Sequence, residues 1–394
     1  MPVRLIRTSR ALFRLPAGVI RGALLVRVLD EWWSYLPAGT IEDQHRDLGF
    51  SYTQAGWLLA LLTLGGLVGG PLGALADRGH RRLLATTGAG VLAAGLGAFA
   101  AGPPFPVLVV AATALGAASD LVIRPLESSL AELAGDNLDR LLGRQHLLTW
   151  LGDFISPALL ALGAATFIGW RGVFAITAAV FLAAAVVLAA TEFPHPAGPD
   201  GNDTESLWRS ARHLARSPEV LLLAAAEFIL LPLDEAFLGF AVARLASGGV
   251  RAAAQVLAAG IVVGGLAGAA IVTRRGINRR LIRTGAAAMV TGAFAAATPA
   301  HVAVQVMGMA SLGLGTAIVW AKVHHRMLTV VPALSATVPT LVGVLSTPAL
   351  AVPALMGIAS DRISITAAVI GTAALTVPLA VVVLKLGGGT LSAA

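Results

Sequence analysis

The chain has 394 residues, of which 57% are hydrophobic and 12% are charged, and its mean hydropathy is +0.81. Soluble domains carry about 25% charged residues, so this composition excludes a water-soluble globular protein. Cysteine is absent, which excludes a disulfide framework and a thiolate metal site. In a soluble protein the net charge of +7 would point to nucleic acid, but here the basic residues must first be assigned to the two sides of a membrane.

Long apolar segments follow one another along the whole chain. Because a helix needs about 20 apolar residues to cross a bilayer, the sequence predicts an all-α membrane protein with twelve transmembrane helices. We expect these spans at residues 19–41, 53–75, 83–101, 106–131, 145–167, 171–190, 218–245, 252–272, 281–298, 301–325, 335–357 and 364–385. The arginine-rich start runs into the first span without a small-residue cleavage site, which favours a cytoplasmic amino terminus over a signal peptide.

The basic residues are distributed unequally between the two sides of the predicted membrane. With both termini in the cytoplasm, only four of them lie on the opposite side: Arg46, Arg171, Arg251 and Arg362. This asymmetry satisfies the positive-inside rule and accounts for the basic charge without nucleic acid. We therefore expect a multi-pass protein of the inner (plasma) membrane that is surrounded by lipid.

Charged residues occur inside the first predicted span. Arg27, Asp30 and Glu31 are spaced at i, i+3 and i+4, which places them on one helical face. Arg27 can pair locally with Glu31, but Asp30 then still needs a partner. An acid at a helix centre costs roughly 2.5 to 3.5 kcal/mol, so such residues normally face a bundle interior or a wet cavity. Trp33 follows them and either anchors the membrane boundary or offers substrate a cation–π surface.

A short basic turn, GALADRGHRR, joins the second and third predicted spans. Gly73 permits close helix approach, and Asp77 can accept hydrogen bonds near a helix terminus. Arg78, Arg81 and Arg82 form a cytoplasmic charge cluster. The turn is either a plain positive-inside anchor, which needs only the arginines, or part of a gate.

The fourth predicted span carries a stripe of alternating charges. Asp120, Arg124 and Glu127 follow at spacings of four and three, so Arg124 can neutralise one acid at a time. Such a triad retains a proton or cation site, although a static charge clasp at the cytoplasmic end of the helix would show the same pattern. The fifth span adds a further membrane acid, Asp153.

One long polar stretch divides the chain. We predict that residues 191–217 form a central cytoplasmic linker. It joins an N-terminal six-helix bundle, 1–190, to a C-terminal six-helix bundle, 218–394. The motif VLDEWW in the first span recurs as PLDEAF in the seventh, and GAAIVTRRGINRR repeats the basic turn in decayed form. Internal repeats of this kind predict two pseudo-symmetric halves with a substrate site near the membrane midplane.

The seventh and tenth spans also carry polar residues. Glu227 and Asp234 are seven residues apart and share a helical face, whereas Glu235 points elsewhere. Asp234 occupies the place in the second half that Asp30 occupies in the first. In the tenth span, Lys322 lies deep in the membrane.

Trp320 and His325 belong to the tenth span as well. His325 shares one side of the helix with Lys322 and Arg326. Arg326 and one histidine can equally mark the inner membrane boundary. Adjacent histidines on a regular helix cannot both face one metal ion, and we expect no metal site.

The basic turn resembles the loop between the second and third helices of the major facilitator superfamily, Gly-x-x-x-Asp-Arg/Lys-x-Gly-Arg/Lys-Arg/Lys. Gly79 and His80 replace the usual x-Gly order. Two longer segments, GFSYTQAGWLLALLTLGGLVGGPLGALADRGHRR and VPALSATVPTLVGVLSTPALAVPALMGIASDR, look like the drug-exporter branch that includes fosmidomycin-resistance-type carriers. The resemblance implies the facilitator fold, a central cavity lined by the first, fourth, seventh and tenth spans, and proton-driven efflux.

These patterns together predict a proton-coupled secondary transporter that exports small lipophilic or cationic molecules by alternating access, as a monomer without a cofactor. We expect proton coupling at Asp30, Glu31, Glu127, Asp234 and Glu235. We expect the substrate cavity at Arg27, Trp33, Asp120, Arg124, Asp153, Glu227, Trp320, Lys322 and His325. We expect the gate at Gly73, Asp77, Arg78, Arg81 and Arg82.

Two other functions stay open at this point. Arg124 and Lys322 could serve as counter-charges for uptake or flipping of an organic anion or a lipid-like solute, and a non-transporting membrane receptor would share the composition. An enzyme is not expected, because the sequence lacks HExxH, a GxSxG elbow and a Walker loop.

Overall fold

The computed structural model describes residues 17–73, 80–134, 138–194, 214–233, 235–249, 251–330 and 337–388. These residues form helices joined by short connections and contain no β-strand. Each of the twelve predicted spans coincides with one helix or with consecutive helices in this part of the chain. The prediction of an all-α membrane protein is confirmed.

The predicted N-terminal half contains the helices α1 (Ala17–Gly39), α2 (Ile41–Leu48), α3 (Tyr52–Gly73), α4 (Arg81–Ala101), α5 (Phe105–Ala134), α6 (Leu138–Ala165) and α7 (Gly169–Ala189). Helix α2 was not predicted, because its sequence IEDQHRDL is too polar for a span. Helix α3 begins at a capping box: the Ser51 N–H donates to Gln54 Oε1 (2.9 Å), and the Gln54 N–H donates to Ser51 Oγ (3.1 Å).

The predicted C-terminal half contains α9 (Pro218–Leu233), α10 (Glu235–Ser247), α11 (Arg251–Arg275), α12 (Arg279–Ala297), α13 (Val302–Thr329), α14 (Thr337–Ser346), a 3₁₀ turn (Thr347–Leu350), α15 (Ala351–Arg362), α16 (Ile365–Ala374) and α17 (Thr376–Gly388). The seventh, eleventh and twelfth spans are thus divided. Pro232, Pro348 and Pro378 lie at or near these divisions, and each removes a backbone donor that a continuous helix requires.

Eight helical segments within the described residues are both long and apolar enough to cross a bilayer. Helix α1 is not among them, since it carries Arg27, Asp30 and Glu31. The α9–α10 pair is not among them either, because two short helices share that span. Helices α3 and α12 are also outside these eight segments.

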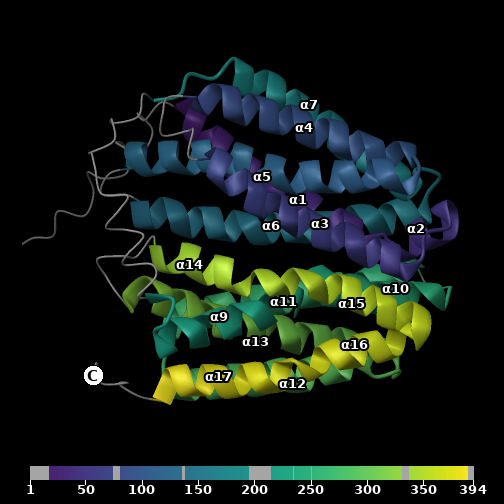
Figure 1. Ribbon diagram of the computed structural model, residues 1–394, viewed down its shortest axis with the longest axis vertical. Coiled ribbons are helices and arrows are strands. Elements are labelled where there is room, and N and C mark those ends of the chain that lie inside the picture. The colour runs from purple at the N-terminus through teal and green to yellow at the C-terminus, as the bar shows by residue number, and fades with distance from the viewer. Residues whose placement is uncertain are drawn as a thin grey trace, which may run out of the picture. The chain divides into compact units, whose positions relative to one another are not determined.

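The described residues cluster into two compact units, whose helices are shown in Figure 1. The first takes the described parts of residues 1–34, 61–156 and 170–200, and the second takes those of 35–60, 157–169 and 201–394. In the first unit α4 packs on α5, and Phe99 of α4 stacks on Phe174 of α7 with ring centroids 5.3 Å apart. In the second unit α13 packs against both α11 and α12. The predicted boundaries at 190 and 218 stay a prediction.

Glycines allow the close helix crossings in both units. A Cβ on Gly88 of α4 would lie 2.7 Å from Val122 of α5, and one on Gly285 of α12 would lie 2.7 Å from Ile318 of α13. Small residues at such crossings let membrane helices approach closely enough for van der Waals packing to hold them together. This packing fixes the helices on which the membrane charges sit.

Candidate functional site

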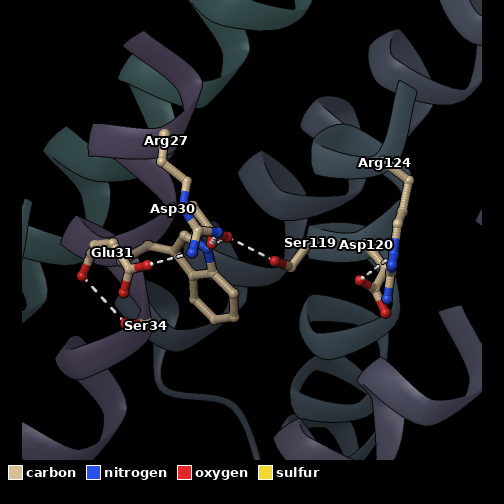
Figure 2. Close-up of polar contacts among 8 residues, drawn as sticks. Arg27, Asp30, Glu31, Ser34, Ser119, Asp120 and Arg124 are labelled. Carbon is tan, nitrogen blue, oxygen red and sulfur yellow. Dashed lines mark hydrogen bonds and ion pairs between the residues drawn. The ribbon is translucent and has the colours of Figure 1, made fainter. Parts of the chain in front are cut away.

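Arg27 of α1 is the centre of a charge cluster in the first unit (Figure 2). Its Nη1 lies 3.3 Å from Asp30 Oδ2, and its Nη2 lies 3.0 Å from Glu31 Oε1. The i, i+3 and i+4 spacing places all three side chains on one face. The local pairing that the sequence left open is therefore present, and Arg27 pairs with both acids rather than with one.

Asp30 has two further partners. Trp33 donates from Nε1 to Asp30 Oδ1 at 3.1 Å, and Ser119 of α5 donates from Oγ to the same oxygen at 2.6 Å. Trp33 is only 4% exposed. Ser119 was missed in the sequence, because nothing in the pattern of α5 sets which of its faces turns toward α1. Asp30 is thus held by partners on both α1 and α5.

Two more acids lie within electrostatic range of Arg27, namely Glu127 of α5 and Asp153 of α6. Four carboxyl groups therefore act on one guanidinium group. Helix α6 reaches the cluster through Gly152, where a Cβ would lie 2.8 Å from the Glu31 Cβ. Ser156, one turn further on, donates a hydrogen bond to the Trp32 carbonyl. The cluster is built by α1, α5 and α6 together.

Arg124 and Asp120 form a second ion pair on α5. Arg124 Nε lies 3.3 Å from Asp120 Oδ1, and the Arg124 side chain is 58% exposed whereas that of Asp120 is 23% exposed. Asp120 also lies within electrostatic range of Asp30. Of the predicted stripe, Arg124 pairs with Asp120, while Glu127 extends the cluster around Arg27.

The second unit contains a cavity of ≈ 150 Å³ between α9, α13 and α14. Its walls are Glu227, Trp320, His324, Met327, Val342 and Gly343. The cavity brings together two predicted residues, Glu227 and Trp320. His324 joins them because it follows Trp320 at i+4 and its ring stacks on the indole, with centroids 4.7 Å apart and an interplanar angle of 9°. His325, the predicted histidine, is exposed and does not line this cavity.

The other predicted residues of the second half are placed as follows. Arg326 Nε lies 2.5 Å from Glu219 Oε1, and Lys322 is within electrostatic range of both. Glu235 is the first residue of α10 and is half-buried. Asp234 lies outside the described residues.

A family model of the Major Facilitator Superfamily matches residues 28–347. The chain belongs to the major facilitator superfamily. It is therefore an integral membrane transporter, and members of this family are generally not enzymes. No curated protein gives a significant match to the sequence of this facilitator.

Solved structures of other transporters share the fold. A D-xylose–proton symporter aligns with a TM-score of 0.72 at 16% identity, covering 95% of this chain and 99% of that one. The nucleoside transporter NupG aligns at 0.70 and 15%, covering 96% and 100%. A bacterial homologue of the human lysosomal transporter Spinster, inward-facing and unoccupied, aligns at 0.71 and 15%, covering 94% and 97%. These structural alignments establish the fold. At such low sequence identities they do not indicate the substrate of this chain.

Only part of the facilitator's basic turn can be placed. Gly73 ends α3, whereas Asp77 and Arg78 lie outside the described residues. Arg81 is 2% exposed, and its Nη1 donates to the Pro194 carbonyl at 3.2 Å. Arg82 is exposed. Arg81 is thus buried inside the first unit and bonded to the backbone at Pro194. The sequence predicted only that it belongs to a cytoplasmic charge cluster with Arg78 and Arg82.

The facilitator also has a polar contact that the sequence analysis missed, at the start of α3. Asp361, in the last turn of α15, accepts the Tyr52 N–H at 3.0 Å and the Thr53 N–H at 2.8 Å. Both residues belong to the second unit. A Cβ on Gly357 of α15 would lie 2.7 Å from the Thr53 Cα, so the two helices approach closely here. Asp361 satisfies two amide groups that a helix start leaves without partners.

Proposed function

We propose that this facilitator is a proton-coupled transporter that exports small lipophilic or cationic molecules by alternating access. In the proposal it acts as a monomer in the plasma membrane, with both termini in the cytoplasm. The observation that carries the proposal is the excess of acid around Arg27, where one guanidinium group faces Asp30, Glu31, Glu127 and Asp153. In the proposal one of these acids binds and releases a proton, because charge at membrane depth is costly.

In the proposed mechanism, the charge on Asp30 couples proton exchange to the conformational change. When a proton binds to Asp30, the carboxylate becomes a neutral carboxylic acid, and its attraction to Arg27 weakens. The Arg27 guanidinium group can then pair with Glu31 alone. When the proton leaves, Arg27, Trp33 and Ser119 hold the carboxylate again. Asp234 and Glu235 are proposed as the counterparts in the second half, and Arg124 with Glu127 would link proton exchange to substrate. The protonation state of the cluster would thereby favour one face of the membrane over the other.

The sign of the substrate's charge is proposed from the partners of the membrane cations. Three arginines of the described helices are each paired with acids: Arg27, Arg124 and Arg326. Lys322 and Arg244 are the cations that an organic anion would use, and Arg244 already donates to the Ala296 and Ala297 carbonyls and to Gln305. Four acids lie within electrostatic range of the Arg27 guanidinium group, and this acidic surrounding favours a cationic or neutral lipophilic substrate over an anion. Assignment to the fosmidomycin-resistance-like branch stays a prediction.

The proposed function is tested by substrate-dependent proton movement in proteoliposomes. A pH-sensitive dye inside the vesicles reports protons while cationic, neutral and anionic aromatic compounds are added in turn. We expect proton movement with lipophilic cations and little with anions. Proton movement only with anions would favour the uptake alternative, and no proton movement with any compound would contradict the proposal.

Alternating access predicts that two single substitutions shift the conformational equilibrium in opposite directions. The predicted topology places the Asp361 contact with α3 at the outer face, and we propose that it breaks when the transporter opens outward. Asp361→Ala removes two capping hydrogen bonds worth about 1 kcal/mol and should favour the outward-open state roughly fivefold. Asp77, by resemblance to the family's gate, stabilises the outward-open state, so Asp77→Asn should favour the inward-open state.

Double electron–electron resonance between spin labels on the outer and inner ends measures both shifts. Each variant is the control for the other, because a general loosening would broaden both distance distributions. Unchanged distances across the outer end in Asp361→Ala would show that the contact carries no conformational energy. Unchanged inner distances in Asp77→Asn would remove the gating role of the basic turn.

A further inference from the structure

The cavity of the second unit contains a carboxyl group without a counter-charge. Glu227 has neither a hydrogen-bond nor an ion-pair partner among the residues that the structure describes. The side chain lies in the middle of the apolar helix α9, between Ala226 and Phe228. A carboxylate in an apolar membrane helix is costly, so it is stabilised by binding a proton or a cation.

The nearest cations of α13 are engaged elsewhere. Arg326 is bound to Glu219 at 2.5 Å. Lys322 interacts electrostatically with Arg326 and Glu219. Neither residue lines the cavity. The carboxyl group of Glu227 is therefore available to a cation that enters the cavity.

Two aromatic side chains also line the cavity. The indole of Trp320 and the imidazole of His324 lie parallel, with centroids 4.7 Å apart, and Met327 adds a polarisable thioether. Aromatic faces attract organic cations, and a thioether makes favourable contacts with aromatic rings. A carboxyl group facing aromatic and thioether groups is a suitable environment for an alkylammonium group and a poor one for a carboxylate.

The size of the cavity limits what can occupy it. Its volume is ≈ 150 Å³, and apolar cavities of about this volume accept a benzene molecule. A quaternary ammonium head group or a single ring fits, whereas a whole drug-sized molecule does not. The cavity would therefore hold one end of a substrate.

We propose that this cavity binds the positively charged end of the substrate, an organic ammonium group carried on an apolar or aromatic body. The inference rests on the proposed function, since it assumes that the substrate is transported. It goes further in naming the substrate class and in assigning its recognition to Glu227, Trp320 and His324. The proton-exchanging cluster around Arg27 belongs to the other compact unit, so recognition and coupling can be tested separately.

The test is the binding of three small probes to the full-length protein in detergent, without a gradient, by isothermal titration calorimetry. Benzyltrimethylammonium carries the cation, neopentylbenzene is its neutral carbon isostere, and phenylacetate carries the opposite charge. We expect the ammonium compound to bind at least about tenfold more tightly than either of the others, which corresponds to about 1.4 kcal/mol.

Substitutions then assign the binding to the cavity. Glu227→Gln keeps the shape and removes the charge, so affinity for the ammonium probe should fall at least about tenfold. Trp320→Leu should lower it several-fold, whereas Trp320→Phe, which keeps an aromatic face, should lose less. Asp47→Asn is the matched control, because it makes the same charge change on α2, outside the cavity, and should bind as the wild type does. If Glu227→Gln does not fold, the Trp320 pair carries the test.

The outcomes separate this inference from the proposed function. Equal affinity of Glu227→Gln and wild type for the ammonium probe, or tighter binding of phenylacetate or neopentylbenzene, would overturn the inference while proton-coupled flux could still be observed. Loss of proton coupling in Glu227→Gln with unchanged probe affinity would make Glu227 a proton site and would also overturn it. Tight ammonium binding without any substrate-linked proton movement would support the subsite and contradict the proposed function.

Discussion

Asp30→Asn is expected to abolish transport driven by a pH gradient while leaving the exchange of substrate for substrate intact. The amide can still accept the hydrogen bonds of Trp33 and Ser119, so the helices should stay in register. It cannot release or take up a proton, and the attraction between Arg27 and a carboxylate at this position no longer changes during the cycle. Net transport requires that change, whereas exchange at equal pH does not.

The measurement compares two assays on the same proteoliposomes. Uptake driven by a pH jump should fall to the level of empty vesicles, and counterflow of labelled substrate should continue. Asp47→Asn on α2 serves as the control for the loss of one acid, and it should behave as the wild type in both assays. Undiminished pH-driven accumulation in Asp30→Asn would remove Asp30 from the coupling mechanism.

Gly152→Ala is expected to cause a large loss of stability. The new methyl group would overlap the Val28 carbonyl and lie 2.8 Å from the Glu31 Cβ, so α6 must move away from α1. Forced overpacking of this kind costs about 1 to 3 kcal/mol. Because α6 also brings Asp153 to the cluster, transport should fall together with stability.

Thermal unfolding in detergent measures this effect, with Gly97→Ala as its control. A Cβ on Gly97 of α4 meets no atom within 4 Å, so that change should leave the midpoint unchanged or raise it, as alanine usually does in a helix. An equally stable Gly152→Ala protein would mean that α1 and α6 are not held in this close crossing.

Much of the fold could be predicted because a bilayer demands long apolar segments, and hydropathy therefore reveals them directly. The spacing of Arg27, Asp30 and Glu31 likewise predicted a shared helical face, and the structure places them there. Helix α2 was missed because it is short and polar. The divisions of the seventh, eleventh and twelfth spans were missed because hydropathy runs on across them, although the prolines near them gave a signal.

The contacts between helices could not be predicted from one sequence. The bond from Ser119 to Asp30 depends on how α5 is rotated about its axis, and the bond from Asp361 to α3 joins residues that are 308 and 309 positions apart. His324 is a different case. Its i+4 spacing from Trp320 predicts stacking on one face, but the charges of the tenth span favoured His325, which shares a side with Lys322 and Arg326.

The central claim, that proton movement and substrate movement are coupled, is tested most directly by the condition of zero net flux. A fixed pH difference is imposed across proteoliposomes with the membrane potential clamped, and the substrate ratio is varied until net transport stops. A proton-coupled exporter should reach zero flux only when an opposing substrate gradient balances the pH difference, and that gradient should grow as the pH difference grows. Zero flux at equal substrate concentrations, whatever the pH difference, would contradict coupling.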